Sequence, residues 1–408
     1  MSESKLVILG GGMVAGYAAK QLVELGLKQG ELAIVSADTA VPYERPPLSK
    51  GFLAGKDSED AIRINSEAFY REHGIEIKLD CEVSSVNTSQ RRLILKSGGE
   101  VAFEKLIIAT GARPRTLNVP GADLRDVHYL RSLDDSKSIR GSTESAKQAV
   151  VIGGGFIGME VAAVLAQKGI GVTMILNEGR IWKKFFSPEM STFFESYYAE
   201  RGVRFVKSAT IKELHGNGVV SSVGLADGES LPCQMVVAGI GVVPATNMLA
   251  NSGIDLQNGV MVNEFLKTHQ ADIYAAGDVA NYQDVIFGKR RRVEHWDNAV
   301  SQGQYCARAL MGDDVPFKHV PYFFSDVFDL SYEYWGDASE ADEVIHRGDL
   351  ASTSFSVWWL QKKHVVAAFI MNRPDEEREA APKWIEEKRV VSSGKLEEAS
   401  ARISNALE

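Results

Sequence analysis

Two glycine-rich turns, each lying between an apolar run and a helix-like segment, constrain this 408-residue chain more than any other feature. The first turn is 10–16 (GGGMVAG), after the apolar run 5–9, and the second is 153–158 (GGGFIG), after 149–152. Between a strand and a helix, such glycines let the backbone approach a pyrophosphate, and the helix N-terminus offers it unpaired N–H groups. The two turns therefore predict two dinucleotide-binding units of Rossmann type.

The fingerprint positions of these turns are the first candidate cofactor contacts. The first turn has alanine at its third fingerprint position, a variant that the pattern tolerates, and the second turn is the cleaner copy. The residues that we expect at the dinucleotides are Gly10, Gly12, Met13 and Ala15 in the first turn, and Gly153, Gly155, Ile157 and Gly158 in the second.

A carboxylate at the end of the next strand reads the adenosine ribose in such units. After the second turn, the strand-like run 172–176 ends at Glu178, whose carboxylate would accept hydrogen bonds from both ribose hydroxyls and repel a 2′-phosphate. NADH is therefore favoured, although Arg180, Lys183 and Lys184 leave NADPH possible. After the first turn, Asp38 is the available carboxylate, one position later than the pattern expects.

Bulk properties exclude several classes of function. A net charge of −9 argues against binding to the nucleic-acid backbone. No apolar run approaches the ~20 residues of a membrane span, and no basic leader precedes the first apolar run, so we expect a cytoplasmic protein without membrane contact. The three cysteines lie far apart without histidine or cysteine companions, so neither a metal site nor a dithiol centre is expected.

Two further strand-like runs carry a family resemblance. One ends in Ala109-Thr110-Gly111 and the other in Gly277-Asp278. They resemble the A-T-G and G-D motifs of the pyridine-nucleotide-dependent flavoprotein reductases, and the resemblance runs through nearly the whole chain. It implies bound FAD, with Asp278 holding the ribitol. It adds three cofactor contacts outside these motifs, namely Val83, Arg113 and Gly241.

The same resemblance implies the architecture. We expect an α/β fold of the glutathione-reductase type, with two Rossmann-like domains and a C-terminal α+β interface domain. The FAD-binding domain would comprise residues 1–112 and 243–318, and the NAD-binding domain would be inserted between them at 113–242. The interface domain would cover 319–408.

The segment 42–50 (PYERPPLSK) selects a branch of that family. It holds no thiol where disulfide reductases carry their redox pair, which excludes a dithiol relay. It resembles the cysteine-free branch of ferredoxin reductases, monodehydroascorbate reductase and apoptosis-inducing factor. In that branch Arg45 contacts the cofactor, and the lysine corresponding to Lys50 lies beside the flavin, paired with the counterpart of Glu160. An ammonium there would stabilise charge developing on the ring.

A second segment, 293–299 (VEHWDNA), begins a helix whose counterpart in the family meets the flavin. The resemblance implies cofactor contacts from Glu294, His295 and Trp296. His295 is not expected to act as a base, because hydride transfer to the flavin removes no proton from carbon.

The resulting prediction is an FAD-dependent NADH reductase that passes hydride from NADH to FAD and then single electrons to a [2Fe–2S] ferredoxin or another one-electron acceptor. The basic run 289–292 could meet an acidic ferredoxin, or it could be a solvated hairpin. The oligomeric state is left open between monomer and homodimer.

Two alternatives remain. The segment 321–331 resembles monodehydroascorbate reductase, so the acceptor could be a small organic radical or a quinone. In our alignment, however, Asp326 and Trp358 stand where the plant enzymes have an arginine and a tyrosine linked to the acceptor. The other alternative is an NADH oxidase or redox-sensing interaction protein similar to apoptosis-inducing factor.

Overall fold

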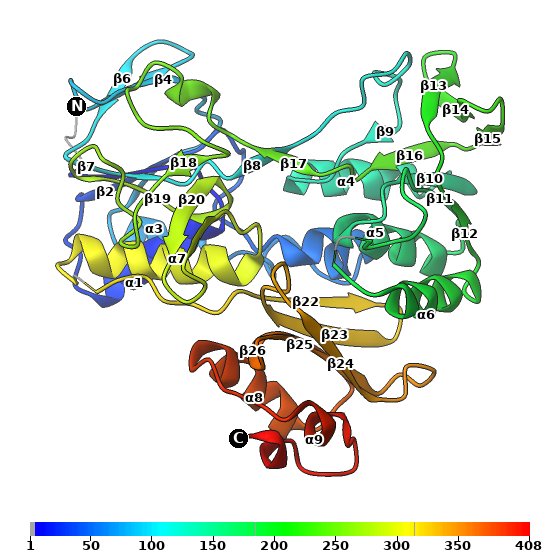
Figure 1. Cartoon of the computed structure of the whole chain (residues 1–408). Helices are drawn as coiled ribbons and strands as arrows, with labels where there is room; N and C mark the ends of the chain where they lie inside the picture. The colour runs from blue at the N-terminus through cyan, green and yellow to red at the C-terminus, as the bar shows by residue number, and fades with distance from the viewer. Residues whose placement is uncertain (1–4, 184, 314) are drawn as a thin grey trace. The chain divides into compact units, whose positions relative to one another are not determined.

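The computed structural model describes residues 5–183, 185–313 and 315–408. Its contacts divide the chain into two units (Figure 1). The first comprises Met1–Arg45, Ser58–Arg113 and Val242–Pro321, and the second comprises Pro46–Asp57, Pro114–Gly241 and Tyr322–Glu408. Each unit has its own hydrophobic core.

A five-stranded parallel sheet with the order β19-β7-β1-β2-β3 forms the centre of the first unit. Its middle strands are short runs of leucine, isoleucine and valine buried on both faces, as parallel sheets require. Helices α1 and α7 pack against each other beside it. The bounds are β1 Leu6–Leu9, α1 Met13–Glu24, β2 Leu32–Val35, β3 Glu76–Lys78, β7 Lys105–Ile108, β19 Ile273–Ala275 and α7 Trp296–Leu310.

Smaller elements complete the first unit. Strands β4 Val83–Asn87, β5 Arg92–Leu95 and β6 Glu100–Ala102 form an antiparallel sheet. A second small sheet joins β18 Val260–Met261, β20 Ala280–Asp284 and β21 Lys289–Arg291. The remaining elements are α3 Glu67–Glu72, β8 Ala112–Pro114, β17 Val242–Pro244, η2 Asn247–Leu249 and η3 Gly277–Val279.

The second unit contains another parallel sheet, with the order β12-β11-β10-β16-β9. Its elements repeat the strand–turn–helix pattern of the first unit, and a three-stranded antiparallel sheet, β13-β14-β15, accompanies it (Figure 1). The bounds are β9 Val127–His128, α4 Leu133–Ser142, β10 Gln148–Ile152, α5 Phe156–Gln167, β11 Gly171–Ile175, α6 Pro188–Ala199, β12 Val203–Val206, β13 Ile211–Gly216, β14 Val220–Leu225, β15 Ser230–Pro232 and β16 Met235–Ala238.

The C-terminal part of the second unit is an antiparallel sheet, β22-β23-β26-β25-β24, with α8 packed on it. The short elements η1 and α2 belong to the same unit and contact α5. The bounds are η1 Pro46–Ser49, α2 Gly51–Ala54, β22 Tyr322–Val327, β23 Leu330–Gly336, β24 Glu343–Gly348, β25 Phe355–Gln361, β26 His364–Met371, α8 Asp375–Glu386, α9 Ser393–Glu397 and η4 Ile403–Ala406.

These elements confirm the expected α/β class with two Rossmann-like sheets and a C-terminal α+β part. The domain boundaries inferred from the sequence remain a prediction, and the contacts group residues 46–57 with the second unit. Within the described residues, every helix is too short or too polar to serve as a membrane span. In the same part of the chain, no three His, Cys, Asp or Glu side chains are gathered as metal ligands would be.

Candidate functional site

The first glycine turn joins β1 to α1 and leaves no room for side chains. Gly10 has φ +120°, and a Cβ there would lie 2.2 Å from the carbonyl oxygen of Ala109. Gly12 is the N-cap of α1 and supplies no side-chain acceptor, and no acidic residue lies in the first helical turn. The helix therefore begins with unpaired N–H groups, an arrangement suited to an anion.

The predicted residues around this turn belong to the same unit. Met13 begins α1, and Ala15, two residues later, is fully buried. A guanidinium nitrogen of Arg45 lies 3.5 Å from the position that a Cβ on Gly12 would take. A positive side chain and the N-terminus of a helix thus lie side by side, and both favour a phosphate.

The carboxyl ends of neighbouring parallel strands supply the next group of predicted residues. Ala109, Thr110 and Gly111 follow β7, and the hydroxyl of Thr110 donates to the carbonyl of Ala245 at 2.7 Å. Gly277 and Asp278 follow β19, where Asp278 is 9% exposed. Because β1, β7 and β19 are parallel neighbours, these loops gather at one edge of the sheet, where doubly wound folds bind ligands.

Asp38, the residue predicted to bind the FAD ribose, also stabilises the loop in which it lies. Its Oδ2 accepts a hydrogen bond from the hydroxyl of Tyr43 at 2.8 Å, and its Oδ1 accepts one from the backbone N–H of Ala40 at 3.2 Å. Each carboxylate oxygen has a second lone pair, so a ribose contact is compatible with this geometry.

The start of α7 is fixed by Glu44. Its Oε2 accepts the indole N–H of Trp296 at 2.6 Å, and its Oε1 accepts the hydroxyl of Tyr17 at 2.5 Å. His295, the N-cap residue of α7, is partly buried with its Nδ1 atom shielded from solvent, and desolvation lowers the pKa of its imidazole to about 4. The imidazole is therefore neutral at pH 7, and its low pKa makes it a weak base.

The second glycine turn repeats the first in the second unit. Gly153 has φ +104°, and a Cβ on Gly158 would lie 2.3 Å from the carbonyl oxygen of Gly153. Gly155 is the N-cap of α5 and provides no capping side chain, while the side chain of Ile157 is 44% exposed beside it. The turn therefore offers unpaired N–H groups and an apolar side chain to a dinucleotide.

Glu178 lies two residues after the leucine that follows β11, half buried at the loop that leads to α6. Arg180 is occupied within that loop. Its guanidinium donates to the carbonyls of Lys183 and Phe186, and to the hydroxyl of Ser191 at 2.6 Å. This arginine is therefore a structural residue, and Lys184 lies outside the described residues.

Lys50 and Glu160 form a buried ion pair inside the second unit. Nζ of Lys50 lies 2.8 Å from Oε1 of Glu160, and Glu160 is only 5% exposed. Two serine hydroxyls also donate to this carboxylate, Ser49 at 2.5 Å and Ser325 at 2.6 Å. The pairing that the resemblance implied is present in the structure.

The remaining predicted contacts are dispersed. Val83 is buried at the start of β4, and Arg113 is exposed in β8. Gly241 has φ +93° three residues after β16. Glu294 is exposed and pairs with Arg292 at 2.5 Å.

The basic run 289–292 is largely occupied by internal partners. Arg290 donates to the carbonyls of Val262 and Asn281, at 2.8 Å and 2.5 Å. Arg291 pairs with the buried carboxylate of Asp284 at 3.4 Å, and Arg292 donates to the carbonyl of Asp278 at 3.0 Å besides pairing with Glu294. The run therefore holds a hairpin in place, and the charges of Arg291 and Arg292 are paired with carboxylates of this chain.

The tryptophans of β25 are core residues. Trp358 is fully buried against Trp384 and donates its indole N–H to the hydroxyl of Ser356 at 3.0 Å. Trp359 is also buried, and its ring lies against that of Phe186. Asp326, by contrast, is exposed on β22. Neither tryptophan is available to an acceptor within this unit.

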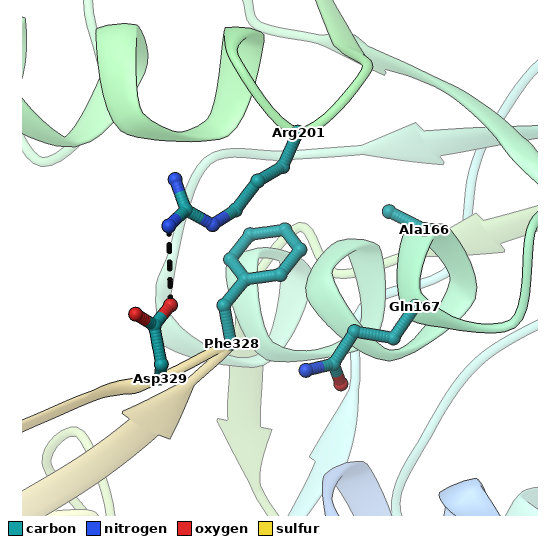
Figure 2. A pocket seen from close by; sticks show the side chains of 5 residues that line it. All are labelled: Ala166, Gln167, Arg201, Phe328 and Asp329. Atoms are coloured by element: carbon teal, nitrogen blue, oxygen red, sulfur yellow. Dashed lines mark hydrogen bonds and ion pairs between the residues drawn. The ribbon is translucent and has the colours of Figure 1, made fainter.

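Figure 2 shows an open hollow at the end of α5 that lies farthest from the glycine turn. It is lined by Ala166, Gln167, Arg201, Phe328 and Asp329. Arg201 pairs with Asp329 at 3.2 Å, and its guanidinium lies 3.4 Å from the ring centroid of Tyr197. These contacts hold the β22–β23 hairpin against α6, and the hollow is separate from the dinucleotide turn.

Three residues that support the predicted ones are not among those predicted from the sequence. Glu44, Ser49 and Ser325 make the hydrogen bonds that hold Trp296 and Glu160. Glu44 and Ser49 lie inside the segment 42–50, where their position next to Arg45 and Lys50 is the signal that could have identified them. No feature of the sequence marks Ser325, because a serine in a strand shows no function until its hydrogen-bond partner is known.

Both turns fit the cofactors that the sequence predicts. Two helices begin at glycines without capping side chains. A Cβ at Gly10 or Gly153 would collide with backbone atoms. A Cβ at Gly155 would instead point into open space. Such cradles suit a pyrophosphate approached by main-chain N–H groups, so each turn has the geometry to hold one dinucleotide.

Comparison with known protein families gives two matches. The family model described as "Pyridine nucleotide-disulphide oxidoreductase" matches residues 4–303, and the model "Reductase C-terminal" matches residues 322–407. Among curated relatives, the peroxisomal monodehydroascorbate reductase 4 of Arabidopsis thaliana is 37% identical over 95% of this chain and 83% of its own length. The monodehydroascorbate reductase of Solanum lycopersicum is 33% identical over 93% of both chains.

Solved structures are similar over the full length. Putidaredoxin reductase, in its covalent complex with putidaredoxin, has a TM-score of 0.94 with 29% identity, covering 100% of this chain and 98% of its own. The ferredoxin reductase of the CYP199A2 system from Rhodopseudomonas palustris has a TM-score of 0.93 with 32% identity, covering 99% and 100%.

Proposed function

We propose that this chain, which belongs to the pyridine nucleotide-disulphide oxidoreductase family, passes hydride from NADH to FAD and then single electrons to a [2Fe–2S] ferredoxin. The chain is an FAD-dependent NAD(P)H oxidoreductase. The acceptor, the preference for NADH and the roles of individual residues are the parts that we propose.

FAD supplies the chemistry, because it accepts two electrons as hydride and can release them one at a time. The protein positions the two dinucleotides and provides the electrostatic field. In our proposal the uncapped start of α1 and Arg45 bind the FAD pyrophosphate, and Asp278 holds the ribitol. The uncapped start of α5 and Glu178 bind NADH.

Lys50 would provide positive charge beside the flavin as hydride arrives. Its ammonium is held by the buried carboxylate of Glu160 at 2.8 Å. The N-terminus of α7, fixed through Trp296 and Glu44, would add the partial positive charge of a helix end. His295 would occupy the N-cap position of α7 with a neutral imidazole that does not cap the helix.

The proposal of a ferredoxin acceptor draws its support from the similarity to ferredoxin reductases. The exposed carboxylate of Asp326 on β22 weighs against an anionic small-molecule acceptor. In our alignment this position is an arginine in the plant monodehydroascorbate reductases, where it suits an anionic radical. A carboxylate at that position repels such an anion. The position aligned with their tyrosine is Trp358, which is buried in the core of the C-terminal sheet.

A monodehydroascorbate reductase activity is the second candidate. It is favoured by 37% identity to a plant enzyme of that name over 95% of the chain. The two candidates differ in what reoxidises the enzyme, a [2Fe–2S] protein or a small organic radical.

A coupled assay tests the proposal. The enzyme is given NADH and cytochrome c, with or without a [2Fe–2S] ferredoxin of the type that serves P450 systems. We expect cytochrome c reduction to require the ferredoxin and to rise in proportion to its concentration. A rate independent of several ferredoxins, together with rapid NADH oxidation by monodehydroascorbate, would instead favour the second candidate.

A further inference from the structure

Three segments of the second unit meet at one buried carboxylate. Glu160 comes from α5, Ser49 from η1 and Ser325 from β22 of the C-terminal sheet. The hydroxyl of Ser49 donates to Oε2 at 2.5 Å, and that of Ser325 donates to Oε1 at 2.6 Å. Both serines are only 1% exposed, so water does not compete for these bonds.

Lys50 approaches the same oxygen that Ser325 holds. Its Nζ lies 2.8 Å from Oε1 of Glu160 and 5.6 Å from the ring centroid of Phe324, the neighbour of Ser325 in β22. Burial raises the pKa of the phenols of Tyr198 and Tyr332, which lie in the same region. These phenols stay neutral, so they add no charge beside Lys50 and Glu160.

Fixing a carboxylate by both oxygens determines where its cationic partner sits. Hydrogen bonds to ionised groups are stronger than neutral ones and are directional. Because a serine hydroxyl donates to each of its oxygens, the carboxylate of Glu160 cannot rotate to bring both oxygens to the ammonium of Lys50. Without the Ser325 hydroxyl, Oε1 keeps only Lys50 as a donor, and the carboxylate can rotate to neutralise and displace that ammonium.

We propose that Ser325 is a positioning residue which, together with Ser49, fixes Glu160 and so holds the ammonium of Lys50 in place for the flavin. The C-terminal sheet thereby tunes the reduction of FAD through a single hydroxyl. This inference rests on the proposed role of Lys50 beside the flavin.

The test compares Ser325→Ala, Ser49→Ala and the double variant with the parent, all as FAD-loaded full-length protein. Anaerobic stopped-flow mixing with NADH gives the limiting rate of flavin reduction and the apparent Kd for NADH. Spectroelectrochemical titration gives the midpoint potential of the bound FAD. We expect Ser325→Ala to lower the limiting rate by about tenfold, which corresponds to the loss of one hydrogen bond to a charged group, and to make the potential more negative. The Kd for NADH should not change.

Ser49→Ala should also lower the limiting rate and the potential. The effect of the double variant on the limiting rate should differ from the sum of the two single effects, expressed as free energies, because both serines hold one carboxylate. Ser356→Ala is the matched control. Ser356 is likewise a buried serine in the C-terminal sheet, and its hydroxyl donates to a buried glutamate, Glu377, at 2.6 Å, in a cluster separate from that of Glu160. It should leave both the limiting rate and the potential unchanged.

Two results would overturn the inference. The first is a Ser325→Ala variant whose limiting rate of flavin reduction and FAD potential equal those of the parent. The second is a Ser356→Ala variant that loses as much of the limiting rate as Ser325→Ala, which would indicate a general effect on the fold of the sheet. Neither result concerns the acceptor, because the half-reaction contains only NADH and enzyme. Failure of the parent enzyme to be reduced by NADH would instead refute the proposed function itself.

Discussion

The indole N–H of Trp296 donates a hydrogen bond to Oε2 of Glu44 at 2.6 Å, which ties the first residue of α7 to the segment after β2. The second oxygen of the same carboxylate accepts the hydroxyl of Tyr17 from α1. Burial and the adjacent carboxylate raise the pKa of Tyr17, so its phenol remains a donor throughout the neutral range. Glu44 thus joins the two helices that flank the first dinucleotide turn.

Removing this acceptor should destabilise the first unit. In Glu44→Ala, two donors lose their partner in a partly buried site, at a cost of about 1–3 kcal/mol for each group that stays unsatisfied. We expect a lower Tm of the FAD-loaded protein and faster release of FAD, measured by thermal melting and by flavin fluorescence. Glu24→Ala in the same helix α1 is the control, because Glu24 is exposed, and an equal loss in that variant would show that Glu44 has no special role.

Cofactor choice should depend on Glu178 and not on Arg180. In Glu178→Ala, the carboxylate that would bind the ribose hydroxyls and repel a 2′-phosphate is gone, so the ratio of kcat/KM for NADH over NADPH should narrow by about tenfold. Arg180→Ala should lower the Tm but keep that ratio, because its guanidinium binds the loop at Ser191 and Phe186. A selective loss of NADPH activity in Arg180→Ala would contradict this assignment.

The partly buried His295 should make the protein less stable in acid. Desolvation lowers the pKa of the His295 imidazole to about 4 from its usual value of 6.5, so the imidazole takes up its proton at a higher pH in the unfolded chain than in the folded protein. The stability that comes from keeping the imidazole neutral is present above pH 6.5 and is lost as the pH falls from 6.5 toward 4. This shift of the His295 pKa corresponds to a loss of roughly 3 kcal/mol in the free energy of unfolding between pH 6.5 and pH 4.

Melting experiments between pH 7.5 and pH 4.5 would detect this effect. His295→Asn should flatten the decline of Tm below pH 6.5, whereas His215→Asn, at an exposed position in β13, should follow the parent curve. Identical pH profiles of the parent and His295→Asn would show that other groups govern acid stability.

The sequence was sufficient for the features that follow from local backbone chemistry. Gly10 and Gly153 lie in positive-φ turns between a buried strand and a helix, as their spacing predicts. The Lys50–Glu160 pair followed from family resemblance, because no local rule links residues so far apart. Glu178 follows the strand after the second turn, as the ribose carboxylate of a Rossmann unit should.

Side-chain partners brought together by the tertiary fold could not be predicted. The basic run 289–292 suggested a docking patch, but Arg290 and Arg291 have backbone and carboxylate partners that lie in other loops and strands. Trp358 aligned with an acceptor residue, yet alternation along β25 turns it into the core toward Trp384. Ser325 is informative only once α5 brings Glu160 to it.

The most direct test of the central claim is the reoxidation of the enzyme after reduction by one equivalent of NADH. The reduced enzyme is mixed anaerobically with a [2Fe–2S] ferredoxin, and in separate experiments with monodehydroascorbate or with oxygen, while the flavin absorbance is followed. We predict a second-order reoxidation by the ferredoxin that is faster than that by the radical or by oxygen. Fast reoxidation by monodehydroascorbate with no measurable reaction with ferredoxin would contradict the account.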